Sequence, residues 1–109
     1  MRLTFLGKAT QGGGSPTLFA TDRNTYVVQG WKVPGQTSTV EIPHRLLAYV
    51  ETGTYVGARM ADTGRGSFTL SGAPVDDTDA LSQMDIPGHE TCVEVPKTEE
   101  RWFGGTAAG

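Results

Sequence analysis

Residues 17–33 read TLFATDRNTYVVQGWKV and predict a β-hairpin. β-branched and aromatic residues fill both halves, and Asp22, Arg23 and Asn24 between them are typical turn residues. Successive side chains of a strand point to opposite faces of the sheet. Tyr26 and Trp31 are five positions apart, so they lie on opposite faces of the second strand. A one-sided core cannot bury both, so at least one of them lies on the surface, beneath a helix or in an interface.

Further strands and two short helices are predicted around this hairpin. Alternating or β-branched residues favour strands at 3–7, 40–42 and 91–95, and a second hairpin that pairs 54–61 with 67–71 across a turn at 62–66. One helix is expected to begin at Pro43 and end before Gly53, and another to begin at Asp76 and stop at Pro87. The predicted fold is mainly β (α+β): a small antiparallel sheet, sandwich or partly open barrel of about six strands.

The length and composition fit one small domain. The chain has 109 residues, with 15 Gly and 6 Pro, so many turns are expected. A chain of this length can bury one core, which we place in residues 1–96. Periodicity is lost after Pro96, and residues 97–109 are predicted to be a flexible C-terminal tail. Trp102 and Phe103 within this tail either dock back on the domain or form a linear interaction segment.

Charge and cysteine content exclude several classes of protein. The net charge is −3, and the basic residues are scattered, which argues against direct nucleic-acid binding. Residues 1–75 hold seven Lys or Arg and four Asp or Glu, whereas residues 76–109 hold two and eight. The single cysteine, Cys92, excludes an internal disulfide and favours a cytoplasmic location. No apolar run is long enough for a membrane span, so no membrane partner is expected.

Asp62-Thr63-Gly64 matches the triplet of aspartic proteases, in which two chains or lobes each supply one carboxylate. A chain of this length could use it only as a dimer. The next residue, Arg65, would favour two ionised carboxylates and oppose the shared proton. A hairpin turn is therefore the favoured interpretation, and a dimeric protease at Asp62 the less favoured one.

A glycine-rich loop at residues 11–17 offers an alternative function. Glycines let backbone N–H groups approach an anion closely, but the Lys-Ser/Thr of a phosphate loop is missing and Pro16 removes a donor. We keep small-ligand or anion binding as a hypothesis, with Arg65 as the counter-charge. Its candidate residues are Gln11, Gly12, Gly13, Gly14, Ser15 and Arg65.

The other combinations of polar residues are weak evidence for a metal or catalytic site. His89 and Cys92 are three apart and His44 is a conceivable third ligand, yet this set is too small for a confident zinc site, so no metal is assigned. Ser15 or Ser67 with His44 could form a nucleophile and base, but no Gly-x-Ser-x-Gly elbow is present. No cofactor is expected, and no catalytic residue is assigned.

Several strings together resemble a known family. They are RLTFLGK at 2–8, QGGGSPTL at 11–18, YVVQGW at 26–31 and DTGRG at 62–66, followed by LSG at 70–72, PV at 74–75 and VEVPK at 93–97. The chain is similar over residues 1–97 to an uncharacterised family of small actinobacterial proteins. The resemblance implies a regulatory accessory encoded near helix-turn-helix regulators, although this chain contains no convincing helix-turn-helix of its own.

The sequence therefore predicts a non-enzymatic interaction module. The two-faced strand, the uneven charge and the lack of a catalytic set favour a cytoplasmic protein that self-associates or binds a transcription regulator. The candidate partner-binding residues are Tyr26, Trp31, Tyr55, Trp102 and Phe103.

Overall fold

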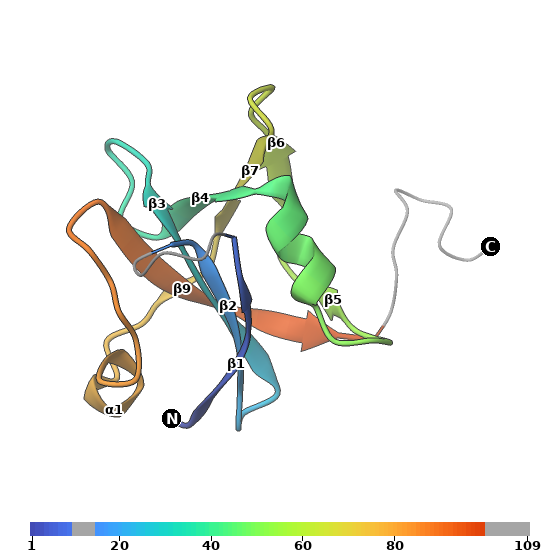
Figure 1. Cartoon of the computed structure of the whole chain (residues 1–109), viewed down its shortest axis with the longest axis vertical. Helices are drawn as coiled ribbons and strands as arrows, with labels where there is room; N and C mark the ends of the chain where they lie inside the picture. The colour runs from blue at the N-terminus through green and yellow to red at the C-terminus, as the bar shows by residue number, and fades with distance from the viewer. Residues whose placement is uncertain (10–14, 100–109) are drawn as a thin grey trace.

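The computed structural model describes residues 1–9 and 15–99. They form a nine-stranded, antiparallel sheet with two short helices, not closed into a barrel (Figure 1). The predicted fold class is thus confirmed. The elements in chain order are β1 (Leu3–Lys8), β2 (Thr17–Thr21), β3 (Thr25–Lys32), β4 (Thr39–Pro43), the 3-10 helix η1 (His44–Tyr49), β5 (Tyr55–Val56), β6 (Met60–Asp62), β7 (Ser67–Ser71), β8 (Ala73–Pro74), α1 (Thr78–Leu81) and β9 (Glu90–Thr98).

Strand β3 is the centre of the sheet. On one side it pairs with β2 up to Gln29, and β4 takes over at Trp31. On the other side β9 accompanies it from Thr25 to Trp31. The sheet continues from β4 through β7 to β6, while β1 pairs with the outer side of β2. The hairpin predicted at 17–33 is confirmed, and Asn24 in its turn has a φ of 60°, which asparagine tolerates better than most residues.

Both faces of β3 are buried. Tyr26 and Val28 belong to the larger cluster, with Leu46 of η1 and with side chains of β2, β4, β7 and β9. Val27 lies on the opposite face in a second cluster with Phe19 and Cys92. Met1, Leu3 and the segment 75–86 around α1 pack over this second cluster. The second face is therefore covered mainly by the N-terminus and an irregular segment, and Figure 1 shows α1, the short helix within that segment, beside the sheet.

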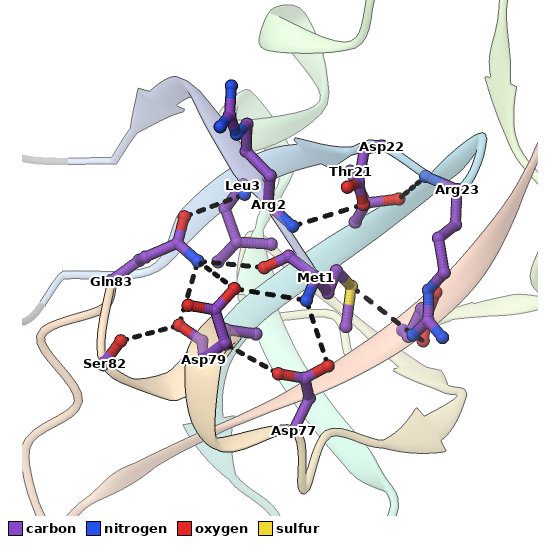
Figure 2. Close-up of polar contacts among 12 residues, drawn as sticks. Met1, Arg2, Leu3, Thr21, Asp22, Arg23, Asp77, Asp79, Ser82 and Gln83 are labelled. Carbon is purple, nitrogen blue, oxygen red and sulfur yellow. Dashed lines mark hydrogen bonds and ion pairs between the residues drawn. The ribbon is translucent and has the colours of Figure 1, made fainter.

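The α1 segment is fastened to the N-terminus of the chain, as Figure 2 shows. Asp77 caps the helix by accepting a hydrogen bond from the Ala80 N–H at 2.9 Å, and its carboxylate also lies 3.1 Å from the Met1 ammonium. Gln83 accepts from the Leu3 N–H and donates to the Met1 carbonyl, each at 2.9 Å. The helix predicted from Asp76 onward is only four residues long, because the chain then turns and carries its apolar side chains across the second cluster.

Two further predictions need correction. Residues 54–61 are not one strand: β6 pairs with β7 as expected, but β5 pairs with the end of β9. Gly57 allows this crossing because its N–H donates to the Pro96 carbonyl at 2.8 Å, where a side chain would crowd the same oxygen. Residues 73–74 form an additional short strand, β8, which also pairs with β9. β9 runs to Thr98, so the predicted tail does not begin at residue 97, and residues 100–109 lie outside the described part of the chain.

We predict that Gly30→Ala destabilises the fold by about 1–3 kcal/mol. A Cβ at this position of β3 would lie 2.6 Å from the Glu41 carbonyl oxygen and 2.8 Å from the Ile42 side chain, so the β3–β4 pairing would have to open. Urea unfolding measures the change. The control is Gly88→Ala, where a Cβ meets nothing within 4 Å. Equal stabilities of the two variants would contradict the tight contact.

Candidate functional site

An apolar groove of about 380 Å³ lies between η1, β5 and β6. We call it the η1–β5 groove; its lining is the loop 51–54 and the side chains of Leu47, Val50, Tyr55, Val56 and Met60. Most of these side chains also pack against the larger core cluster, so the floor of the groove is an outward extension of the core. The groove can accept an apolar side chain, and it offers few polar groups for chemistry.

Tyr26 holds in place the loop 51–54, which lines this groove. Its side chain is fully buried, and its hydroxyl accepts a hydrogen bond from the Glu51 N–H at 3.0 Å. Thr54 donates its own hydroxyl proton to the Glu51 carbonyl, so the Tyr26 hydroxyl is the donor in its contact with Thr54. Lys97 lies over the Tyr26 ring and pairs with the Glu51 carboxylate at 2.5 Å. These contacts fix the loop 51–54.

The predicted partner-binding residues are therefore separated. The prediction that Tyr26 lies on the surface is wrong, because the larger cluster and η1 cover its face of β3. Trp31 is half-buried on the opposite face of the same strand. Tyr55 is half-buried and lines the η1–β5 groove. Trp102 and Phe103 lie outside the described residues.

The residues proposed for ligand binding at the glycine-rich loop are only partly placed. Gln11, Gly12, Gly13 and Gly14 lie outside the described residues. Ser15 is buried, and its carbonyl accepts from the Thr17 hydroxyl at 2.7 Å. Arg65 donates two hydrogen bonds of 3.1 Å to the Glu41 carboxylate, so its charge already has a partner. The cation that contacts the strand end before this loop is Arg45, whose Nε donates to the Ala9 carbonyl at 3.0 Å.

The Asp62-Thr63-Gly64 triplet forms the predicted hairpin turn. The exposed Asp62 carboxylate accepts the Gly64 N–H at 2.8 Å, and both Gly64 and Gly66 have positive φ. This contact is an Asx turn, a common way to begin a tight hairpin. The hypothesis of a dimeric protease at Asp62 stays a prediction.

The structure brings Ser67 and His44 together but does not couple them as nucleophile and base. Ser67 Oγ donates to the Glu41 carboxylate at 2.5 Å, while His44 Nε2 lies 3.1 Å from the Ser67 carbonyl and 3.5 Å from Asp62. The Ser67 hydroxyl, followed by Arg65, lowers the pKa of Glu41. A serine activated by histidine would need a hydrogen bond between their side chains, so this cluster ties the β6–β7 hairpin to β4.

The structure contains a buried acidic residue that the sequence did not predict. Glu90 is 2% exposed at the start of β9, and its Oε1 accepts from Gln29 Nε2 at 2.7 Å. The same Gln29 nitrogen donates to the Asp85 carbonyl at 2.7 Å. Glu90 Oε2 has no hydrogen-bond partner; His89 Nε2 is 3.6 Å away. Burial raises the pKa of Glu90. The sequence carries no signal for this pair, because the cover over this face comes from an irregular segment.

Cys92 faces the second cluster, on the opposite face of β9 from Val93. Both faces of β9 are buried here, so both residues are inside. Burial raises the pKa of the Cys92 thiol to about 11. Within the described ranges, no group of three or more His, Cys, Asp or Glu side chains is placed to hold a metal ion. None of the described helices is long and apolar enough to cross a membrane.

Comparisons with protein-family models, curated proteins and solved structures find no match. The resemblance to the actinobacterial family therefore stays a prediction.

We predict that Cys92 reacts slowly with Ellman's reagent at pH 8 in the folded protein. Raising the thiol pKa from 9.0 to about 11 lowers the reactive thiolate about a hundred-fold, and burial also hinders access. The rate should rise to that of a free thiol in urea. The variant Cys92→Ser with Ser82→Cys is the control, because Ser82 is exposed. Similar rates for the two folded proteins would contradict the buried position.

We predict that Glu90→Gln gains stability relative to the parent protein as the pH rises. The pKa of Glu90 is raised in the folded state, so its full contribution to stability is present only below the ordinary value of 4.5. That contribution is lost as the pH rises from there through the folded-state pKa, and glutamine does not titrate. Thermal unfolding between pH 4 and pH 8 measures the difference. Exposed Glu99→Gln is the control, and a stability difference that is constant with pH would refute the explanation.

Proposed function

We propose that the chain is a non-enzymatic, cytoplasmic interaction module that self-associates by seating the Trp102–Phe103 pair of one copy in the η1–β5 groove of another. The observation that carries the proposal is the position of the groove at the end of β9. Thr98, near the end of the described chain, pairs with Tyr55 in the wall of the groove. Four residues later the sequence reaches Trp102 and Phe103.

The groove and the aromatic pair match chemically. Buried aromatic anchors in apolar pockets dominate the binding energy of many protein interfaces. Aromatic side chains bring a large apolar surface with few rotatable bonds. The groove has an apolar floor, and its few polar atoms are largely tied up in the contacts among Tyr26, Glu51 and Thr54. The proposed contact therefore removes apolar surface from water without stranding buried polar groups.

The direction of β9 favours a second copy as the occupant. β9 runs antiparallel to β5, so at Thr98 it is directed past Thr54 and away from Met60 on the other wall of the groove. We therefore propose a second copy of the chain, rather than the same chain, as the occupant of the groove. A reciprocal exchange gives two identical contacts and closes as a symmetric dimer.

A transcription regulator is the alternative partner, which the family resemblance implies. An apolar side chain of a regulator would use the same groove. Self-association of the purified chain needs no other protein, so it separates the two possibilities.

We predict that the purified chain dimerises and that both halves of the contact are required. Sedimentation equilibrium should show dimers for the parent chain, and monomers for Met60→Lys and for Trp102→Ala with Phe103→Ala. Mixing these two variants should restore association, because one copy keeps its groove and the other its aromatic pair. Tyr55→Ala, a milder change in the groove, should weaken dimerisation if Met60→Lys fails to fold. Lys32→Ala on the exposed end of β3 is the control.

Fluorescence distinguishes exchange from docking within one chain. In a Trp31→Phe background, Trp102 is the remaining tryptophan. Exchange predicts a blue shift that grows with protein concentration and disappears in Met60→Lys. A monomer at high concentration, or a blue shift independent of concentration, would overturn self-association through this groove.

A further inference from the structure

A second concavity lies on the opposite face of β3 from the η1–β5 groove. It is a hollow of about 210 Å³, and we call it the β1–β3 hollow. Its described lining comes from β1, β2, β3 and the segment after α1, with Gln29 of β3 among the lining residues. Drug-sized ligands usually occupy larger pockets, so this volume suits a molecule of the size of a single amino acid.

Gln29 presents a hydrogen-bond acceptor to this hollow. Its amide nitrogen donates both hydrogens, one to the Asp85 carbonyl and one to Glu90 Oε1, each at 2.7 Å. A carbonyl oxygen can only accept, so this contact fixes which end of the amide is the nitrogen. The amide oxygen of Gln29 is then its free hydrogen-bonding atom. Gln29 is 1% exposed, so its side chain is preorganised and loses little conformational freedom when a ligand binds.

The neighbouring polar groups are also acceptors. The Thr17 hydroxyl donates its proton to the Ser15 carbonyl, so its oxygen lone pairs are left to accept a hydrogen bond. Asp85 adds an exposed carboxylate to the lining. Gln83 is occupied by its contacts with Met1, Leu3 and Asp79. Several acceptors around one hollow favour a ligand group that carries several N–H donors, which is the property of an ammonium.

Two aromatic rings and a lysine complete the lining. Phe5 is 57% exposed, and its ring meets Phe19 edge to face with centroids 6.3 Å apart. The rings give an apolar surface for a hydrocarbon chain, and the face of a ring also attracts a cation. Lys8 is the one cation among the described lining residues, and its ammonium group can pair with a carboxylate of the ligand.

We propose that the β1–β3 hollow binds a small zwitterion with an apolar side chain, of the size of an aliphatic amino acid. Asp85 and the Gln29 oxygen receive its ammonium group, Lys8 pairs with its carboxylate, and Phe5 with Phe19 cover its hydrocarbon chain. This site is independent of the proposed self-association, because it uses the other face of β3.

L-leucine is the probe that tests the proposal. Two analogues lack one charge each: 3-methylbutylamine has no carboxylate, and 4-methylpentanoate has no ammonium. NMR titration of the ¹⁵N-labelled full chain should show saturable shifts with leucine at Thr17, Phe19 and the Gln29 side-chain amide. We expect each analogue to bind about tenfold more weakly, the usual effect of losing one charged contact.

Two variants assign the charged ends of the ligand. Asp85→Asn should weaken leucine and 3-methylbutylamine about tenfold and leave 4-methylpentanoate unchanged. Lys8→Met should weaken leucine and 4-methylpentanoate and leave the amine unchanged. Asp76→Asn and Lys32→Met make the same chemical changes outside the hollow and should have no effect. Both site variants alter side chains outside the core, and their spectra report whether the fold is intact.

The absence of saturable shifts with leucine at 20 mM, or shifts confined to residues away from the hollow, would overturn the proposal. Binding of leucine with the same affinity in Asp85→Asn and Lys8→Met would overturn it as well. Equal affinity for leucine and 3-methylbutylamine would show that the carboxylate is not recognised and would refute the zwitterion.

Discussion

Burial of both faces of β3 is the constraint on which the other elements depend. A strand that carries Tyr26 and Val28 on one face and Val27 and Gln29 on the other exposes no face that water can solvate well. Each face needs a cover, and 109 residues leave little chain for two full layers. The covers are accordingly short: η1 and the loop after it on one side, and the N-terminus with the α1 segment on the other.

The same strand also fastens both covers through polar atoms. On one face, the Tyr26 hydroxyl receives the Glu51 N–H and holds the loop 51–54. On the opposite face, the Gln29 amide holds the chain at Asp85 and Glu90. Neither cover is complete, and each leaves one concavity at its edge, the η1–β5 groove and the β1–β3 hollow. Both candidate binding surfaces are therefore consequences of the way in which β3 is covered.

Local patterns predicted the parts of the fold that depend on local chemistry. The hairpin at 17–33 and the turn at Asp62 follow from alternation and turn residues, and the structure confirms them. The break between β5 and β6 depends on the distant Pro96 carbonyl, which no local pattern reports. Cys92 and Glu90 were missed for a related reason, since alternation cannot show that an irregular segment covers the second face of β9. The sequence identified Tyr55 as a surface candidate, but not the groove that it lines.

Glu90 is the residue whose presence most needs an explanation. A buried carboxyl with one unpartnered oxygen destabilises the fold, and an apolar side chain would fill the position without that cost. Removing the carboxyl, however, would leave the Gln29 amide with one acceptor, the Asp85 carbonyl, for two hydrogens. The Asp85 carbonyl would still fix which end of the amide is the nitrogen, but the second hydrogen of this buried amide would have no acceptor. Glu90 thus satisfies the second hydrogen of the buried Gln29 amide, and its own unpartnered oxygen is the local cost of that contact.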